Sequence, residues 1–307
     1  MSQNFPIIII VGPTASGKTA LGVKVAQKYN AEIISADSMQ IYKGMPIASA
    51  VPTMEERCGV PHHLMEFVSP NERFSVSEYI KCANQKIEEI KSRNKNVCIV
   101  GGTGLYIDCL LSNTVFKEED SAEIRAELEK KADDVGLDVL YGQLLEKDPI
   151  YAEKLHRNDR KRIIRALEVM TLHGVTVTEL NKNSRTEEFP HNYVILGLNF
   201  RDRELLYDRI NRRVDIMVEN GLLCEAKQSF NTEKSETSRQ AIGHKELFPY
   251  FEGEEDLETC LKKIKTESRR YAKRQLTWFR KNEKINWIYA DEQDAEQTAY
   301  EIIDKNI

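Results

Sequence analysis

The sequence predicts an α/β fold, a P-loop NTPase-like parallel sheet flanked by helices, with an all-helical insertion. Three observations predict this class. An apolar run at 6–11 leads through a glycine-rich turn into a helical pattern at 20–26. Strand-like and helix-like segments then alternate as far as residue 111, which is typical of βαβ units in a parallel sheet. Between residues 119 and 191 only helical spacing occurs.

The glycine-rich turn has the spacing G-x-x-x-x-G-K-[ST] of a P-loop. Its residues are Gly12, Pro13, Thr14, Ala15, Ser16, Gly17, Lys18 and Thr19. Glycines let backbone N–H groups surround an oxyanion at the positive end of a helix, so we expect these residues to bind a diphosphate group. Lys18 is then expected to reach the terminal phosphate oxygens, and the Thr19 hydroxyl to bind Mg²⁺. Kinases, NTPases and diphosphate-releasing transferases all need this site, and an ordinary βα turn is the alternative.

The remaining segments complete the predicted sheet and its helices. Further strands are predicted at 32–36, 96–100, 193–198 and 287–289. Helices are predicted at 75–92, 121–132, 137–146, 150–155, 159–172, 203–221 and 257–281, whereas 44–61 is expected to be irregular and 231–237 mobile. The α/β core would therefore comprise residues 1–118 and 192–307, and the helical insertion residues 119–191.

Composition indicates an ordinary globular protein of the cytoplasm. Of 307 residues, 41% are hydrophobic and 30% charged. No apolar run approaches the roughly 20 residues that a membrane span needs, and no basic leader precedes the first apolar run. The six cysteines form no C-x-x-C pair, so neither a zinc site nor a disulfide framework is predicted, which suits a reduced cytosol.

Charge is unevenly distributed along the chain. The net charge of −5 argues against a nucleic-acid partner. However, segments 154–165 and 262–281 are rich in Lys and Arg and contain only Asp159 and Glu267 as acids. Because the other acids gather mainly at 118–134 and 252–258, the basic segments are predicted to form a basic face. Scattered, solvated charges are the alternative interpretation.

Asp37 is the leading candidate for a catalytic carboxylate. It follows the predicted strand 32–36, and the ends of parallel strands are where an α/β sheet places its chemistry. The later strand ends in Gly101-Gly102-Thr103-Gly104, without the acid that usually holds Mg²⁺ in a P-loop NTPase. Asp37 is therefore predicted to be a displaced magnesium ligand or a general base, with a simple capping role as the alternative. The Gly101–Gly104 turn either completes a diphosphate site or is a plain tight turn.

Two other pairs of residues have a possible chemical role. His62 and His63 suggest a metal site, but no Cys or acid lies at ligand spacing, so structural or substrate-loop histidines are favoured. Arg209 and Arg213 are four residues apart on a predicted helix and share one face. Such a pair suits an oxyanion, unless it meets helix acids such as Asp208.

Seven segments in order resemble the tRNA dimethylallyltransferase (tRNA isopentenyltransferase) family, in its bacterial form. They are GPTASGKT (12–19), SADSMQIYKGM (35–45), PHHL (61–64), VGGTGLY (100–106), ND (158–159) with RIIRALE (162–168), QAIGHKE (240–246) and RQLTWFR (274–280). They extend over nearly the whole chain, and so many ordered segments are far more specific than a P-loop alone.

The resemblance implies transfer of a dimethylallyl group from dimethylallyl diphosphate to N6 of the adenosine 3′-adjacent to the anticodon, in tRNAs reading codons that start with U. Asp37 matches the general base of the family. Lys18, Thr19, Thr103 and Arg213 match positions that approach the diphosphate and the reacting centre, with Mg²⁺ as cofactor. The family uses its P-loop on the diphosphate of the donor without hydrolysing ATP, which agrees with the missing acid.

The resemblance also implies a tRNA anticodon stem-loop as partner, and a monomer without a membrane partner. The positions that match tRNA-contacting segments are Asp37, Ser38, Met39, Gln40, Thr103, Arg125, Lys161, Arg162, Ile163, Ile164, Arg165, Gln240, Ala241, Ile242, Gly243, His244, Lys245, Arg274 and Arg280. The target base must leave the anticodon stack to reach Asp37.

One segment departs from the family pattern, and three other functions are alternatives. Residues 46–52 replace the usual Asp-Ile-Gly-Thr-Ala-Lys-Pro, so the Gly and the Lys are missing, and the zinc finger of eukaryotic relatives is also absent. The alternatives are an adenylate isopentenyltransferase acting on free AMP or ATP, a P-loop kinase of small metabolites, and a non-catalytic RNA-binding P-loop protein.

Overall fold

The computed structural model describes residues 5–112, 122–183, 189–292 and 294–307. The chain forms two compact units, residues 1–110 with 190–307 and residues 111–189. The second unit occupies the region predicted as a helical insertion at 119–191. Its first residue, Leu111, comes earlier than the predicted start, which lies outside the described residues.

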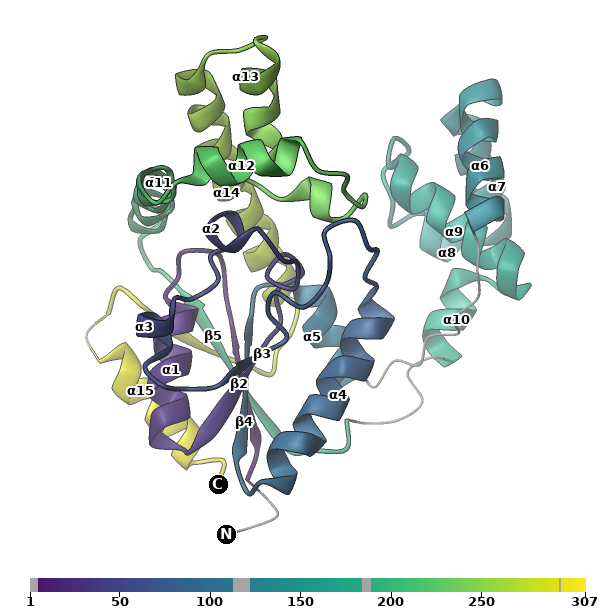
Figure 1. Cartoon of the computed structure of the whole chain (residues 1–307). Coiled ribbons are helices and arrows are strands. Elements are labelled where there is room, and N and C mark those ends of the chain that lie inside the picture. The colour runs from purple at the N-terminus through teal and green to yellow at the C-terminus, as the bar shows by residue number, and fades with distance from the viewer. Residues whose placement is uncertain (1–4, 113–121, 184–188, 293) are drawn as a thin grey trace. The chain divides into compact units, whose positions relative to one another are not determined.

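The first unit is built on a six-stranded parallel sheet with the order β3-β2-β4-β1-β5-β6 (Figure 1). The strands are β1 Ile7–Val11, β2 Ala31–Ser35, β3 His62–His63, β4 Asn96–Gly101, β5 Tyr193–Asn199 and β6 Ile285–Tyr289. Every residue of β1 and β2 is buried, as expected for strands covered on both faces. The sheet confirms the predicted fold class, although the two-residue β3 was too short to be predicted.

Helices flank the sheet of this unit. They are α1 Lys18–Lys28, α2 Pro46–Ser49, α3 Met54–Arg57, α4 Val76–Ser92, α5 Gly104–Leu111, α11 Arg203–Glu219, α12 Leu222–Phe230, α13 Phe248–Glu252, α14 Leu257–Phe279 and α15 Ala295–Asp304. The segment 44–61, predicted as irregular, contains α2 and α3. Pro46 opens α2, and Thr53 with Glu56 forms a capping box on α3, so short helices form between the turn residues. No helix among the described residues could cross a membrane.

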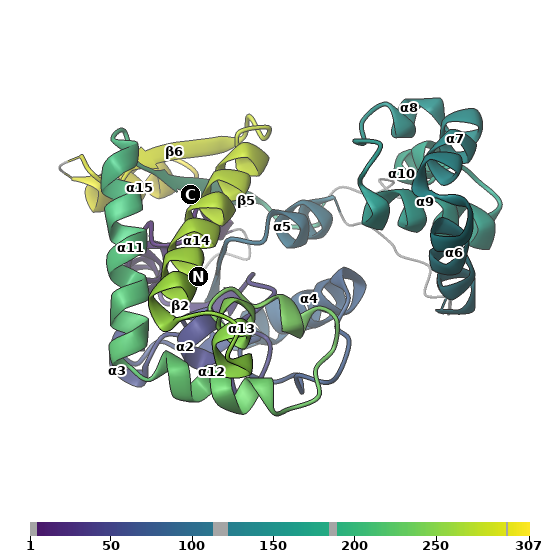
Figure 2. The same ribbon diagram turned by 90° about the horizontal axis from the view of Figure 1, so that it is seen from above.

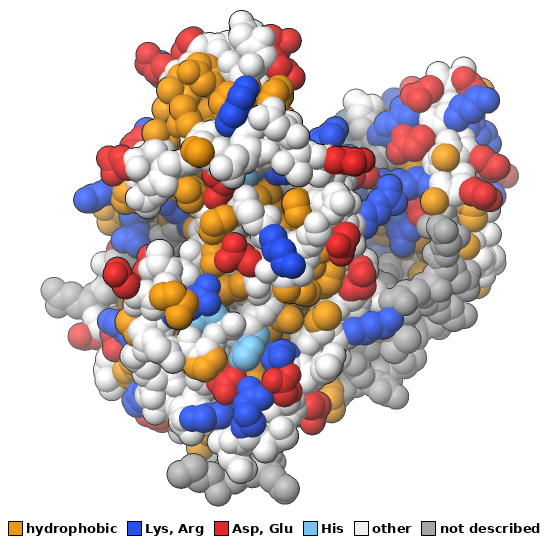
Figure 3. All heavy atoms as spheres, viewed as in Figure 1, with side chains coloured by type: hydrophobic (Ala, Val, Ile, Leu, Met, Phe, Trp, Pro, Cys, Tyr) orange, Lys and Arg blue, Asp and Glu red, His pale blue; other side chains and the backbone are white. Residues whose placement is uncertain are grey.

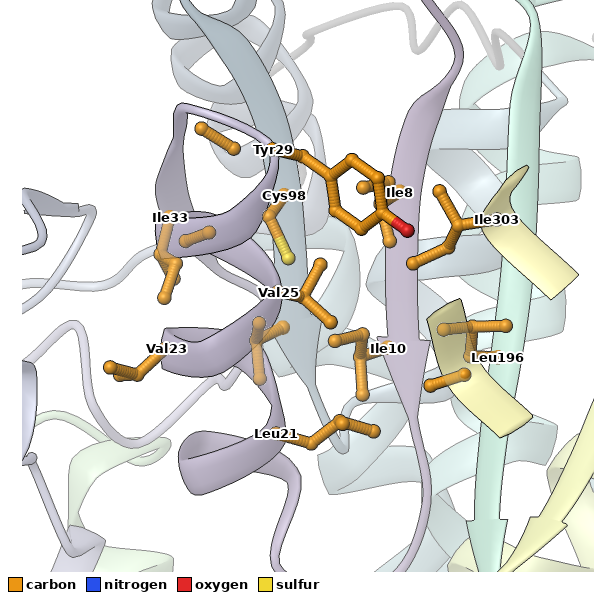
Figure 4. Close-up of a cluster of buried hydrophobic side chains, with 14 of the residues drawn as sticks. Ile8, Ile10, Leu21, Val23, Val25, Tyr29, Ile33, Cys98, Leu196 and Ile303 are labelled. Carbon is orange, nitrogen blue, oxygen red and sulfur yellow. The ribbon is translucent and has the colours of Figure 1, made fainter. Parts of the chain in front are cut away.

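The packing of α1 and α15 against one face of the sheet forms an apolar core (Figure 4). Val25 of α1 and Ile303 of α15 approach Ile8, Ile10 and Leu196 of the central strands, and all of these side chains are almost fully buried. Each buried aliphatic side chain of this size contributes about 1.5–3 kcal/mol relative to exposure. This packing fixes the start of α1, and hence the turn between β1 and α1.

The strand register brings the carboxyl ends of β1, β2 and β4 to one edge. Val11 lies beside Gly101, and Ser35 lies beside Val100. The P-loop, the segment after β2 and the Gly101–Gly104 turn therefore leave the sheet together. Helices α11 and α14 lie side by side, as seen from above in Figure 2, and share a cluster that includes Ile210 and Leu276.

The second unit consists of helices among its described residues. They are α6 Ala122–Val135, α7 Leu137–Lys147, α8 Pro149–Ala152, α9 Arg160–His173 and α10 Val177–Asn183. Leu140 and Leu144 of α7 pack with Ile163, Ile164 and Leu167 of α9 in a separate core. The unit therefore has its own hydrophobic core, as expected for an independently folded insertion.

Candidate functional site

The P-loop turn between β1 and α1 depends on glycine at both ends. Gly12 has a φ of 149°, and a Cβ there would lie 2.6 Å from the carbonyl oxygen of Leu198. Gly17 has a φ of 92° and makes no side-chain cap on α1, which begins at Lys18. The first N–H groups of α1 are consequently available to an anion at the positive end of the helix.

Lys18 is held inside this turn. Its Nζ donates to the carbonyl oxygen of Pro13 at 2.6 Å. Burial lowers the pKa of Lys18 from 10.5 to about 7, the charge of Asp37 opposes the shift, and the charge of Arg213 adds to it. A lysine in this state gains from a nearby anion, because the anion stabilises the protonated amine.

The turn opens into a cavity of about 360 Å³ within the first unit. Its wall combines the P-loop, the segment after β2, α11, the 240–245 segment and α14. The polar lining residues are Thr14, Lys18, Thr19, Asp37, Ser38, Gln40, Ser49, His62, Arg213, Gln240, Lys245, Ser268, Tyr271, Arg274 and Gln275. Ile210, Val214 and Met217 of α11 give the same cavity an apolar side. The site can therefore take a ligand with both a charged and an apolar part.

Asp37 is oriented by its own backbone. Its Oδ1 accepts hydrogen bonds from the N–H groups of Met39 at 2.9 Å and Gln40 at 3.4 Å. Residues 38–41 form a turn, and Asp37 caps this turn, as its alternative role predicted, in addition to lining the cavity. The bonds hold the carboxylate at the cavity wall, where a ligand in the cavity can reach it.

The Gly101–Gly104 turn packs directly against the segment that carries Asp37. Thr103 Oγ1 accepts a hydrogen bond from the Ser38 N–H at 3.0 Å. At Gly101 a Cβ would lie 2.1 Å from the carbonyl oxygen of Ala36, so only glycine fits. The turn therefore fixes the position of Asp37, a more specific role than that of a plain tight turn.

Arg209 and Arg213 reach the P-loop from α11. Arg209 Nε donates to the carbonyl oxygen of Ala15 at 3.0 Å, and Arg213 Nη1 donates to Thr14 Oγ1 at 3.1 Å. Burial lowers the pKa of Arg213, while the charge of Asp37 opposes that shift. The pair therefore adds positive charge to the oxyanion site.

Two polar residues of α14, Tyr271 and Gln275, also belong to the site, although no sequence motif assigns them a role. Gln275 bonds the Thr14 N–H and the Gly102 carbonyl oxygen, which are 261 and 173 residues away in sequence. Both residues lie on the cavity wall. Their spacing of four on a helix was visible, but nothing local indicates that this face meets the P-loop.

The predicted tRNA-contacting positions of the first unit differ in whether they line the cavity. Most line the cavity: Asp37, Ser38, Met39, Gln40, Gln240, Ala241, Ile242, Lys245 and Arg274. His244 does not, because its ring is 1% exposed. Its Nε2 lies 2.8 Å from Glu225 Oε1 and its Nδ1 lies 3.3 Å from Lys234 Nζ. The buried His244 side chain therefore holds this loop through its two partners, and the tRNA contact predicted at this position stays a prediction.

In the second unit, α9 separates the predicted positions by face. Lys161, Arg162 and Arg165 are exposed, whereas Ile163 and Ile164 are buried in the helical core. The 3.6-residue period turns the two isoleucine side chains inward, so only their backbone is left for the tRNA contact predicted for this segment. Arg125 is half-buried on α6, and Arg280 is exposed at the end of α14.

Basic side chains of α14 are partly neutralised by acids. Lys265 pairs with Asp215 at 2.6 Å, and Arg270 pairs with Glu267 at 2.7 Å. Figure 3 shows Lys and Arg intermixed with Asp and Glu on the visible face of the first unit. These ion pairs lower the net positive charge of the basic face that was predicted from segment 262–281.

The side chains at the cavity fit a magnesium ion that is bound together with a phosphate ligand. Thr19 and Asp37 line the cavity, and the buried Ser16 hydroxyl has no hydrogen-bond partner among the described residues. The described residues contain no cluster of three or more His, Cys, Asp or Glu side chains that could hold a metal alone. Mg²⁺ commonly takes few protein ligands and several from phosphate and water, so this sparse set suits it. His63 instead binds Glu32, at 2.6 Å.

These features define the class of protein: an α/β protein with a P-loop oxyanion site that shares its cavity with an oriented carboxylate. The family model described as IPP transferase matches residues 40–282. The chain belongs to the IPP transferase family.

Relatives extend this similarity over nearly the whole chain. The chain is 46% identical to a protein named tRNA dimethylallyltransferase from Caldanaerobacter subterraneus, and the alignment covers 98% of this chain and 96% of that protein. It is 45% identical over 92% of its length to the protein of that name from Bacillus subtilis, covering 90% of it.

Solved structures show the same fold. The tRNA isopentenylpyrophosphate transferase of Bacillus halodurans gives a TM-score of 0.71 at 39% identity, covering 99% of this chain and 98% of the other. A eukaryotic dimethylallyltransferase acting on tRNA gives 0.77 at 29% identity, covering 97% of this chain and 77% of the other.

Proposed function

We propose that this protein transfers a dimethylallyl group from dimethylallyl diphosphate to N6 of the adenosine 3′-adjacent to the anticodon, in tRNAs that read codons starting with U. The observation that carries the proposal is one cavity lined by Lys18 of the P-loop, Arg213 of α11 and Asp37. The relatives named tRNA dimethylallyltransferase support the same assignment. The enzyme is a prenyltransferase that releases diphosphate and, we propose, acts as a monomer.

The chemistry needs a base at the acceptor nitrogen. The adenine amine is a poor nucleophile because its lone pair is delocalised into the ring, so removal of its proton helps attack on the dimethylallyl carbon. We assign this role to Asp37, whose carboxylate is oriented by the Met39 and Gln40 N–H groups. The proton moves from N6 to the carboxylate as the new C–N bond forms.

The opposite end of the donor needs stabilisation of negative charge. As the C–O bond breaks, charge accumulates on the departing diphosphate. Lys18, Arg213 and the P-loop N–H groups surround the position where it would lie. Thr19, and the Ser16 hydroxyl, would hold Mg²⁺ with the diphosphate oxygens, and this ion would supply further neutralisation of the leaving group.

The acceptor base has to leave the anticodon stack to enter the cavity. Unstacking costs a few kcal/mol, which contacts from the protein must offset. Gln40, Gln240, Lys245 and Arg274 line the cavity and offer polar groups for this purpose. The apolar side formed by Ile210, Val214 and Met217 suits the dimethylallyl group.

The deciding experiment compares two acceptors. The protein is incubated with Mg²⁺, labelled dimethylallyl diphosphate and either an unmodified tRNA with adenosines in its anticodon loop or free AMP. We expect label in the tRNA and not in AMP. Label in AMP alone would favour the adenylate isopentenyltransferase, and label in neither would remove the proposal.

Diphosphate binding is expected to take up a proton above neutral pH. Lys18 has a pKa of about 7, so most of it is neutral in the free protein at a pH well above 7. A bound diphosphate stabilises its charged form, so affinity should fall as pH rises through and beyond 7. Calorimetry with inorganic diphosphate in two buffers of different ionisation enthalpy measures the uptake.

Lys18→Met is the reference for this measurement, because it removes the titrating group and leaves the proton equilibria of the ligand unchanged. Net uptake should be larger in the wild type than in Lys18→Met by up to about one proton. Equal uptake by the two proteins would show that Lys18 is already charged before the ligand binds.

Arg162→Ala is expected to weaken tRNA binding more than turnover. Arg162 is exposed on α9, with Asp159 as its partner at 3.3 Å. Loss of one phosphate contact should lower the slope of log affinity against log salt by about 1. Binding titrations at several salt concentrations measure this slope, and Lys147→Ala, an exposed cation on α7 outside the basic segment, is the control. An unchanged slope for Arg162→Ala would exclude a phosphate contact.

A further inference from the structure

The side chain of Gln275 joins two loops of the cavity that are far apart in sequence. Its Oε1 accepts the Thr14 N–H at 2.8 Å, and its Nε2 donates to the Gly102 carbonyl oxygen at 2.9 Å. The residue is 5% exposed. One buried amide of α14 therefore holds the P-loop and the Gly101–Gly104 turn at a fixed separation.

The chemistry of both partners requires an amide at this position. A backbone N–H can only donate and a carbonyl oxygen can only accept, so the orientation of the Gln275 amide is fixed. An ionised glutamate would place an acceptor against the Gly102 oxygen, and a methionine would leave both backbone groups without a partner. Burying polar groups without a hydrogen-bond partner is unfavourable.

The absence of a side chain at Gly102 leaves room for the Gln275 amide. A Cβ at Gly102 would lie 2.1 Å from Gln275 Nε2, and no other atom would be closer than 3.3 Å. The φ of Gly102 is not in the left-handed region, so its backbone does not demand glycine. The missing side chain at Gly102 is thus explained by Gln275 and not by a turn conformation.

A further hydrogen bond connects the Gly101–Gly104 turn with the segment that carries Asp37. Thr103 follows Gly102, and its hydroxyl accepts the Ser38 N–H next to Asp37. Tyr271 lies one helical turn before Gln275, and hydrogen bonds with Thr103 and Gln275 lower its pKa in part, against the larger rise caused by burial. The same helix therefore contacts the leaving-group side and the base side of the cavity.

We propose that Gln275 is a positioning residue that sets the distance between the diphosphate in the P-loop and the base Asp37. The inference rests on the proposed transfer reaction, and it concerns a residue that touches neither reacting atom. Displacement of reacting groups by about 1 Å can cost 100-fold in rate. Loss of the amide should therefore lower kcat more than tRNA affinity, and thermal unfolding measures separately the stability lost with the two hydrogen bonds.

The test uses Gln275→Met and Gln275→Glu in steady-state transfer to tRNA at about pH 8. We expect kcat to fall about 10- to 100-fold in both, with KM for tRNA within about threefold of the wild type. Thermal unfolding and the fraction of protein that binds inorganic diphosphate are measured on the same samples. Gln297→Met, an exposed glutamine on α15, is the control for the substitution itself.

The pH profile of Gln275→Glu separates positioning from simple damage to the fold. A protonated carboxyl group has one acceptor and one donor, as the amide does. Its activity relative to the wild type should therefore rise as the pH is lowered from about 8 to about 5.5. Gln275→Met should show no such recovery.

Gly102→Ala tests the positioning role of Gln275 independently, because its methyl group would meet the Gln275 amide. It should lower kcat in the wild type by pushing the amide away, but should cost little more in Gln275→Ala, where the space is empty. Near-wild-type kcat in Gln275→Met and Gln275→Glu, or fully additive losses in the double variant, would overturn the positioning role. A wild-type protein without transfer activity would instead refute the proposed function.

Discussion

Asp37→Asn should bind tRNA and diphosphate normally and transfer the dimethylallyl group about 10²- to 10⁴-fold more slowly. The asparagine oxygen can still accept the N–H groups of Met39 and Gln40, so the turn at residues 38–41 is expected to survive. Only the capacity to take the N6 proton is lost. Single-turnover transfer with preformed enzyme–tRNA complex measures this chemical step.

Asp291→Asn is a control for the substitution itself: Asp291 also accepts two backbone N–H groups, those of Arg201 and Asp202, although it uses both carboxylate oxygens and the asparagine keeps only one of these bonds. It does not line the cavity. We expect this variant to turn over at the wild-type rate. An Asp37→Asn protein with a rate close to that of the control would remove Asp37 as the general base.

Lys18→Met is expected to have the second largest effect, a loss of about 10²- to 10³-fold in kcat. The half-buried Lys18 amine lies in the P-loop, where the diphosphate gains charge as it departs. The loss should be larger in kcat than in the affinity for dimethylallyl diphosphate, because charge on the leaving group grows in the transition state. Initial rates over a range of donor concentrations separate the two quantities.

Lys24→Met tests whether any lysine of α1 would give this loss. Lys24 lies on the outer side of the helix, where it pairs with Glu296. Exposed pairs contribute about 0–1 kcal/mol, so near-normal activity is expected. If Lys18→Met raised only the KM for the donor and left kcat unchanged, Lys18 would contribute to ground-state binding alone.

The parts of the site that could be predicted from sequence are those whose geometry is local. The P-loop is a run of consecutive residues that follows a buried strand, and its glycines have the backbone angles that the motif demands. Asp37 is predictable because it lies two residues after the end of β2 in a parallel sheet, whose strand ends share one edge. In both cases position in the chain determines position in space.

Contacts between distant segments could not be predicted in the same way. Nothing near Gln275 in sequence specifies that α14 meets the P-loop, because that contact depends on the packing of α11 against α14. His244 carries a side chain that suits RNA, but its burial against Glu225 is set by α12. Ile163 and Ile164 were assigned to a basic segment whose helical period turns them into the core.

The central claim is that the diphosphate in the P-loop leaves as a unit when an adenine nitrogen attacks the dimethylallyl group. The most direct measurement is product stoichiometry, with the donor labelled separately in its dimethylallyl carbons and its phosphorus, in the presence of tRNA and Mg²⁺ and without ATP. The claim predicts one diphosphate released for each dimethylallyl group found in the tRNA, with no orthophosphate. Transfer that requires ATP, or phosphorus label entering the tRNA, would contradict it.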